Sequence, residues 1–217
     1  MTELARHQDF GQLRETLEWV RRHSPFYRER LAAAGEIRTV EEFRARVGRT
    51  LKTEVAAEQR AAPPFGRLLA VPRQEVTLLH TSPGPIYIPR IAEEKGGTPV
   101  LQHAFRTMGV RPGEVAHVTL SYHVMPGGLR LHRAFEEYGC LVINGGTGSS
   151  ELQVEMARAY EATVYAGTPT FFANLLDTAR KMGLEPRTDL RYRLGFSTAQ
   201  ALAPPLRREI EEGFGCE

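Results

Sequence analysis

The amino-acid sequence predicts an α/β protein in which a largely parallel sheet carries helices on both faces and is preceded by a helical amino-terminal arm. Two observations carry this prediction. In the later two thirds of the chain, short apolar runs alternate with longer segments of helical spacing, a pattern typical of parallel strands joined by crossover helices. The first third holds mostly polar segments of helical spacing, which indicates helices.

Four helices are expected in the arm. Apolar residues recur every three or four positions over Phe10–His23, so a helix is predicted there. Ser24-Pro25 is typical of a helix start and predicts a second helix that runs through Ala33. Two shorter helices are predicted over Val40–Arg46 and Thr53–Arg60.

A domain boundary is expected at Ala61-Ala62-Pro63-Pro64, because this segment breaks helical structure. We therefore expect residues 1–62 to form the arm, packed on the main domain, and residues 63–217 to form the α/β domain. Five apolar runs in this domain are predicted strands: Val76–His80, Val115–Leu120, Cys140–Ile143, Thr163–Tyr165 and Tyr192–Phe196. Five helices are predicted over Pro99–Met108, Gly128–Tyr138, Ser150–Tyr160, Pro169–Met182 and Pro204–Phe214.

Ligands of such sheets bind outside the carboxyl ends of the strands. The expected site therefore lies where the loops that follow the strands gather, in residues 81–85, 121–128, 144–149, 166–168 and 197–203.

The composition is that of an ordinary globular protein. Of the 217 residues, 41% are hydrophobic and 25% are charged, with a net charge of +2, so attraction to nucleic acid or to an anionic membrane is not expected. Cys140 and Cys216 are the only two cysteines of the sequence, which argues against a disulfide scaffold and fits a reducing compartment. With no apolar run of membrane length and no visible signal peptide, we expect a soluble, cytoplasmic protein.

Several short motifs share the order and spacing of one enzyme family. They are Ser24-Pro25-Phe26-Tyr27-Arg28, Pro64-Phe65-Gly66, Ala70-Val71-Pro72, Gly109-Val110-Arg111-Pro112-Gly113, Gly127-Gly128-Leu129, Gly139-Cys140 and Gly167-Thr168-Pro169-Thr170. In these motifs the chain resembles the N-terminal half of the phenylacetate–coenzyme A ligases, which are adenylate-forming enzymes that activate a carboxylic acid with ATP and pass the acyl group to coenzyme A. The resemblance implies ATP or AMP, coenzyme A and a small aryl or acyl carboxylic acid as candidate ligands.

The nucleotide motifs implied by this resemblance are degenerate. The family's phosphate loop resembles Ser-Ser-Gly-Thr-Thr-Gly-Lys-Pro, whereas here Pro85-Ile86-Tyr87-Ile88 replaces Thr-Thr-Gly-Lys. The second nucleotide element resembles Gly-Ala-Glu-Pro, and this chain has Thr198-Ala199-Gln200-Ala201. The residues that correspond to a nucleotide site are Ser82, Gly84, Arg90, Thr198, Ala199 and Gln200.

Two interpretations of the segment from Ser82 to Arg90 stay open. It is either a modified phosphate or acid cradle in which Arg90 replaces the lysine, or a hairpin stiffened by proline. We favour the hairpin, because prolines supply no backbone N–H and the lysine is missing.

The resemblance also implies a wall of an acid pocket after the second strand of the predicted sheet. The candidates are Tyr122, His123, Met125, Gly127 and Gly128, with ordinary packing at the strand end as the alternative. The glycine run from Asn144 to Ser150 is interpreted as a turn and helix cap rather than an anion site.

No metal site and no catalytic residue is assigned. His117, His123 and His132 have irregular spacing, unlike the paired ligands of zinc motifs. Neither cysteine has a histidine and acid nearby in the sequence, and no Gly-x-Ser-x-Gly turn occurs.

We expect no ligase activity from the chain alone. The sequence stops at Glu217, before the position of the family's Tyr-Gly-x-(Ser/Thr)-Glu motif, so the resemblance implies that adenine and magnesium contacts are missing. The leading hypothesis is a small-ligand-binding or partner protein. The alternative is one piece of a split ATP-dependent acyl-CoA ligase that another chain completes, and a third is a remnant without selected activity. A homo-oligomer is also expected.

Overall fold

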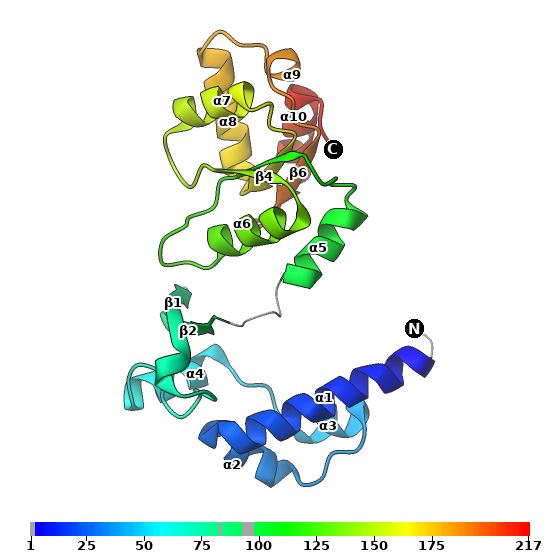
Figure 1. Cartoon of the computed structure of the whole chain (residues 1–217), viewed down its shortest axis with the longest axis vertical. Coiled ribbons are helices and arrows are strands. Elements are labelled where there is room, and N and C mark those ends of the chain that lie inside the picture. Colours follow the sequence, from blue (N-terminus) through cyan, green and yellow to red (C-terminus); the bar gives the residue numbers. More distant parts are fainter. Residues whose placement is uncertain (1–2, 83, 93–97) are drawn as a thin grey trace. The chain divides into compact units, whose positions relative to one another are not determined.

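A computed structural model describes residues 3–82, 84–92 and 98–217, with side chains from residue 10 onward. The chain divides into two compact units, Met1–Glu93 and Glu94–Glu217, which Figure 1 shows in blue to green and in green to red. Residues 63–82 and 84–92, which we expected within the α/β domain, belong to the first unit.

The first unit contains all four helices predicted for the arm. They are α1 (Glu3–His23), α2 (Pro25–Ala34), α3 (Val40–Arg46) and α4 (Lys52–Ala61), followed by the 3₁₀ turn η1 (Arg73–Glu75). Ser24 begins α2 as predicted, because its hydroxyl accepts the Tyr27 N–H at 3.5 Å. The same hydroxyl lies 3.2 Å from the carbonyl oxygens of both Arg67 and Leu68. One buried serine therefore caps a helix and holds a distant loop.

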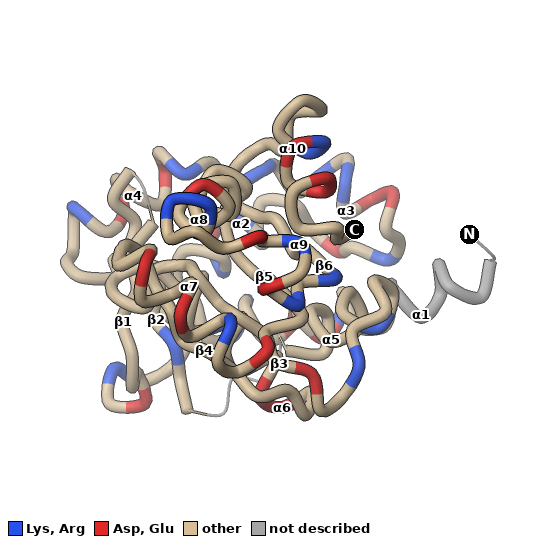
Figure 2. Tube along the Cα trace, turned by 90° about the horizontal axis from the view of Figure 1, so that it is seen from above, with Lys and Arg blue, Asp and Glu red and all other residues tan. Residues whose placement is uncertain are grey.

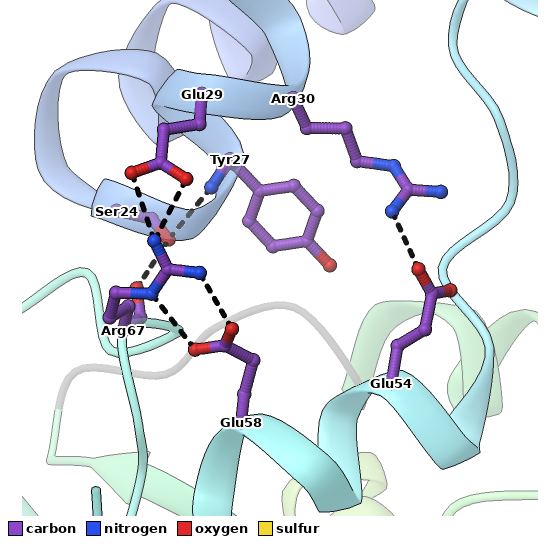
Figure 3. A network of polar contacts seen from close by, with 7 residues as sticks. All are labelled: Ser24, Tyr27, Glu29, Arg30, Glu54, Glu58 and Arg67. Atoms are coloured by element: carbon purple, nitrogen blue, oxygen red, sulfur yellow. Dashed lines mark hydrogen bonds and ion pairs between the residues drawn. The ribbon is translucent and has the colours of Figure 1, made fainter. Parts of the chain in front are cut away.

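An arginine links two helices of the first unit, α2 and α4 (Figure 3). The Arg67 guanidinium contacts Glu29 of α2 at 2.8 Å and Glu58 of α4 at 2.7 Å. Gly66 precedes it with φ of +61°, and a Cβ there would lie 2.4 Å from the Glu58 carbonyl oxygen. The approach of this loop to α4 therefore requires glycine.

Two strands complete the first unit, β1 (Val76–Ser82) and β2 (Ile86–Ile91). They form a separate antiparallel hairpin in which Ser82 pairs with Ile86 and His80 pairs with Ile88. The prediction that Val76–His80 joins the parallel sheet is therefore wrong, whereas the favoured interpretation of Ser82 to Arg90 as a hairpin is confirmed. The nearest pairing partner along the sequence is β2, and a short connection allows only an antiparallel pair.

The second unit is the predicted parallel sheet with its helices. Its sheet has the order β4-β3-β5-β6, and every neighbouring pair is parallel. The strands are β3 (Val115–Val118), β4 (Leu141–Asn144), β5 (Val164–Gly167) and β6 (Leu194–Ser197). The helices are α5 (Thr98–Thr107), α6 (Gly127–Tyr138), α7 (Ser150–Ala159), α8 (Pro169–Lys181), α9 (Pro186–Asp189) and α10 (Pro204–Phe214). Only the short α9 was not predicted.

Alternate residues of the strands point to two buried clusters on opposite faces of the sheet. Ala116 and Val118 of β3 belong to a cluster with residues of α5 and α6, in which the Phe105 and Phe135 rings stack at 3.9 Å. Tyr165 of β5 belongs to the other cluster, with residues of α7, α8 and α10, and it stacks on Phe172 at 3.8 Å. This arrangement confirms the predicted helices on both faces.

Charged residues of both signs are interspersed along the trace (Figure 2), in keeping with the small net charge of +2. Within the ranges described, no helix combines the length and apolar character needed to cross a membrane.

Candidate functional site

The four parallel strands end on the same side of the sheet, which we call its carboxyl edge. Backbone hydrogen bonds continue between the residues that directly follow the strands. The Thr119 N–H donates to the Ala166 carbonyl at 2.9 Å, and the Thr198 N–H donates to the Gly167 carbonyl at 2.9 Å. The Gly146 N–H likewise donates to the Val118 carbonyl at 3.1 Å. The loops that leave this edge therefore start from fixed positions.

Tyr122 is the best placed of the acid-pocket candidates. Its ring is half-buried, and its hydroxyl oxygen lies 3.2 Å from Nδ1 of His132 on α6. The ring also approaches the loop after β4, since its Cδ2 lies 4.0 Å from where a Cβ on Gly146 would be. Burial raises the pKa of the Tyr122 hydroxyl well above its usual range, so it stays a neutral donor.

The other acid-pocket candidates have different environments. His123 is exposed, and its backbone N–H donates to the Ser121 hydroxyl. Met125 is half-buried. A Cβ on Gly128 would lie 2.5 Å from the Ser121 carbonyl oxygen, and one on Gly127 would lie 3.1 Å from Cδ1 of Leu120. Gly128 is therefore explained by the close packing of α6 on the loop that precedes it.

The second nucleotide element lies beside the segment after β5. Ala199 is exposed with φ of +66°, and Gln200 is also exposed. Oε1 of Gln200 accepts a hydrogen bond from Oγ1 of Thr170 at 2.6 Å. Thr168 caps α8, because its hydroxyl accepts the Phe171 N–H at 3.3 Å. The structure thus brings Gln200 to the motif Gly167-Thr168-Pro169-Thr170.

Ser82, Gly84 and Arg90 lie in the first unit, at the end of β1, in the turn and in β2. Gly84 is exposed with φ of +111°, and Arg90 is half-buried opposite Leu78. Tyr87 lies between Gly84 and Arg90 in the sequence, and the buried side chain of Gln59 on α4 binds both of its backbone polar groups. Its Nε2 donates to the Tyr87 carbonyl at 2.8 Å, and its Oε1 accepts the Tyr87 N–H at 2.9 Å. The Tyr87 amide is therefore already occupied.

A buried polar network beneath the strand-end loops is the part of the site that sequence reasoning missed. Nδ1 of His117 on β3 lies 2.6 Å from the Tyr192 hydroxyl oxygen. The Thr119 hydroxyl donates to the Tyr165 hydroxyl at 2.9 Å, which in turn donates to the Thr168 carbonyl at 2.7 Å. A polar residue within an apolar strand, such as His117, was the one signal available.

Gln153 on α7 connects this network to the glycine loop. Its Nε2 lies 3.2, 3.3 and 2.6 Å from the carbonyl oxygens of Gly145, Gly146 and Gly148. Its Oε1 and Nε2 of His117 lie 2.4 and 2.6 Å from where a Cβ on Gly145 would be. A larger residue at position 145 would therefore displace these two buried side chains, and Gln153 holds the loop as a turn, as predicted. The predicted helix cap is wrong, because Ser149 at the start of α7 makes no side-chain capping hydrogen bond.

Burial favours the neutral forms of one histidine and two cysteines in the second unit. Burial lowers the pKa of His117 to about 4, with a smaller opposing effect from Gln153. Burial also raises the pKa of the Cys140 and Cys216 thiols to about 11, which disfavours the reactive thiolate. The described residues contain no group of three or more side chains suited to hold a metal ion.

The second unit is thus an α/β domain with polar groups at the carboxyl ends of its parallel strands, the position at which such sheets bind their ligands. No protein-family model matches the chain. It is 32% identical over 214 residues to phenylacetate-coenzyme A ligase of Pseudomonas putida, a match that covers 93% of this chain and 47% of that protein. It is 30% identical to the enzyme of the same name from Thermus thermophilus, over 94% of this chain and 46% of that protein.

Solved structures agree with the sequence comparison. An open conformation of 2-hydroxyisobutyryl-CoA ligase, crystallised with 2-HIB-AMP and CoA, has a TM-score of 0.88 and 26% identity. That match covers 98% of this chain and 52% of the ligase. The chain spans about half the length of the curated relatives that it matches. The chain is therefore related to the phenylacetate–coenzyme A ligases and corresponds to about half of one, in keeping with an N-terminal half.

Proposed function

We propose that this protein binds a small aryl or acyl carboxylic acid, or a partner protein, without adenylating the acid by itself. The observation that carries this proposal is the shortage of available backbone N–H donors in the hairpin segment that aligns with the family's phosphate loop. Pro85 and Pro89 have no N–H to offer, and the Tyr87 N–H is bound by Gln59 at 2.9 Å. A phosphate grip needs several backbone N–H donors that converge on the anion.

The strand pairing supports the same conclusion. Ile86 and Ile88 lie in β2 opposite Ser82 and His80 of β1. A phosphate loop needs glycines and a lysine near the terminal phosphates, whereas this segment is an antiparallel ladder with isoleucine side chains. In the second element, Gln200 carries an amide in place of the family's acid and is hydrogen-bonded to Thr170.

The acid would bind at the carboxyl edge of the sheet, next to Tyr122. Tyr122 and His132 are half-buried, and they supply a hydroxyl, an imidazole and the aromatic ring of the tyrosine. Apolar surface with a few polar groups suits a small ligand. Two buried free thiols fit a cytoplasmic setting, and we keep a homo-oligomer as part of the proposal.

Isothermal titration with phenylacetate, ATP–magnesium and AMP tests the proposal. We expect phenylacetate to bind the wild-type chain and a Tyr160→Ala control, since Tyr160 is exposed at the end of α7. Tyr122→Ala should lose the binding. A coupled assay with coenzyme A should detect no acyl-CoA. Robust synthesis of phenylacetyl-CoA by the isolated chain would refute the proposal.

One piece of a split ligase is the second candidate. It is favoured by the fact that relatives at 32% and 30% identity are matched over only 47% and 46% of their length. In this case ATP and coenzyme A would be used only after a second chain has bound. Co-purification from the native host, followed by an acyl-CoA assay of the complex, distinguishes this candidate from the first.

A further inference from the structure

The first unit contains a cavity of about 290 Å³ that is built from four segments of the chain. These segments are α2, α4, β2 and the loop over residues 65–70. Phe65 and Gln59 of the lining are buried, Tyr87 is exposed, and the other lining residues are half-buried. The cavity is therefore a hollow that opens to solvent.

The walls of this cavity are held to one another. The loop is joined to α2, because the Phe26 N–H donates to the Arg67 carbonyl at 3.1 Å. The Arg67 guanidinium also joins the loop to α4, through Glu58 at 2.7 Å. The Gln59 side chain joins α4 to β2 through both backbone polar groups of Tyr87. These contacts oppose a collapse of the walls into the space between them, so the cavity is preformed, as ligand sites usually are.

Most of the lining is apolar. Phe65 and Leu68 come from the loop, and Ile88 comes from β2. The amide of Gln59 adds little polarity to the lining, because its oxygen and nitrogen both bind the Tyr87 backbone. Water in such a space finds few hydrogen-bond partners, whereas an apolar ligand that displaces the water is stabilised by burial. The cavity therefore favours an apolar ligand.

The size and the aromatic walls of the cavity suit a single aromatic ring. A cavity of ~150 Å³ is enough for benzene, so about 290 Å³ leaves room for a ring with one short substituent. The lining includes the rings of Tyr27, Phe65 and Tyr87, and aromatic rings pack favourably on one another. The two tyrosine hydroxyls are the remaining polar side-chain groups of the lining. They suit a ligand with one polar substituent.

Two arginines beside the cavity are already paired with glutamates. Figure 3 shows the Tyr27 ring between the ion pairs that Arg67 and Arg30 make. Arg67 contacts Glu58 at 2.7 Å. Arg30 contacts Glu54 at 3.0 Å. An anionic ligand would have to compete with these carboxylates for the two guanidinium groups, and an unpaired charge is costly to bury. The cavity therefore favours an uncharged ligand.

We propose that this cavity is a second binding site, which takes an uncharged molecule with one aromatic ring and one polar substituent. All of its lining residues belong to the first unit, whereas the acid-site residue Tyr122 belongs to the second. The inference therefore does not depend on acid binding at Tyr122.

The test uses the full chain and a matched pair of probes, phenylacetamide and phenylacetate, which share the ring and differ in charge. Nuclear magnetic resonance follows the methyl groups of Val55 and Ile88, which line the cavity, so the readout reports on the first unit. We expect phenylacetamide to shift these resonances in a saturable manner. Phenylacetate should bind there at least about tenfold more weakly, because its charge would be buried without a free partner.

A cavity-filling variant checks the location. Ala70→Leu places a larger side chain at a lining position, where it takes up space that the ligand needs. Ala57→Leu is the matched control, since Ala57 is exposed on α4. We expect Ala57→Leu to bind phenylacetamide like the wild type, and Ala70→Leu to bind it at least about tenfold more weakly.

Circular dichroism shows whether Ala70→Leu folds, and if it does not, the probe pair on the wild type decides the question. The proposal is overturned if phenylacetamide leaves the Val55 and Ile88 methyl resonances unchanged, or if phenylacetate binds there equally well. It is also overturned if folded Ala70→Leu keeps the affinity of the wild type. Since the readout lies in the first unit, these outcomes are distinct from a failure of acid binding at Tyr122.

Discussion

His117 and Tyr192 are hydrogen-bonded across strand β5 of the sheet. Nδ1 of His117 on β3 lies 2.6 Å from the hydroxyl oxygen of Tyr192, which precedes β6. In the sheet, β5 separates these two strands, so the bond links elements that are not themselves paired. Both side chains are buried, and a buried hydrogen bond of this kind costs more to break than an exposed one.

The buried imidazole should make stability depend on pH. Burial lowers the folded pKa of His117 to about 4, whereas an unfolded histidine titrates near about 6.5. The unfolded state then binds more protons below about 6.5, so the free energy of unfolding falls as pH drops from about 6.5 to about 4, by up to about 3 kcal/mol. Urea unfolding at several pH values across this range measures the loss.

His117→Asn removes the titrating group and keeps a polar atom near the Nδ1 position. We expect this variant to have a shallower dependence of stability on pH than the wild type. His103→Asn is the matched control, because His103 is exposed on α5, and its pH dependence should follow the wild type. Equal slopes for His117→Asn and the wild type would contradict the prediction.

The amide of Gln153 should be necessary for the glycine loop. Gln153→Glu replaces the Nε2 donor by a carboxylate oxygen, which would face the carbonyls of Gly145, Gly146 and Gly148. We expect a loss of about 1–3 kcal/mol in the free energy of unfolding, together with faster hydrogen exchange in residues 145–149. The reverse swap Glu155→Gln, at an exposed position of α7, should change stability little. The idea fails if the two swaps have the same effect.

Gly145 should not tolerate a methyl group. A Cβ there would lie 2.4 Å from Oε1 of Gln153 and 2.6 Å from Nε2 of His117. We expect Gly145→Ala to destabilise the second unit by about 1–3 kcal/mol, because the buried groups have to move. Gly127→Ala makes the same chemical change where only the end of the Leu120 side chain is close, at 3.1 Å. In thermal unfolding, Gly127→Ala should have a higher melting temperature than Gly145→Ala. The opposite order would refute the steric argument.

Ser24 should matter more than an ordinary helix cap. Ser24→Ala loses the cap of α2 and the contacts with the Arg67 and Leu68 carbonyls, so a loss of about 1–2 kcal/mol is expected in the first unit. Thr39→Ala also removes a cap, since Thr39 accepts the Glu42 N–H at 3.1 Å, but Thr39 is exposed. Denaturant unfolding followed by the fluorescence of Trp19 compares them, and equal losses would show that the loop contacts add nothing.

Local signals predicted the elements well. Val40–Arg46 and Pro204–Phe214 form helices over the predicted residues, because caps, prolines and apolar spacing are properties of neighbouring residues. The partner of Val76–His80 was predicted wrongly, since an apolar run does not reveal whether its neighbour runs parallel or antiparallel. The four-residue helix α9 is too short for its periodicity to be detected.

The candidate site was predicted only in outline. Four of the five expected loops follow strands of the parallel sheet, and the acid-pocket candidate Tyr122 lies in one of them, against His132. The fifth, predicted over residues 81–85, is wrong, because it follows β1 of the hairpin instead. Contacts such as Gln59 with Tyr87 and His117 with Tyr192 join residues far apart in the sequence. No local pattern encodes them, because they depend on how whole elements pack.

The carboxamide of Gln59 also has a consequence for how the hairpin behaves toward other molecules. By donating to and accepting from Tyr87, it imitates one peptide group of a missing neighbour. An open strand edge is a template on which other chains can pair, and this side chain occupies the edge of β2 at Tyr87. A Gln59→Leu variant would leave the same edge available, and its visible sign would be slow fibril growth rather than simple unfolding.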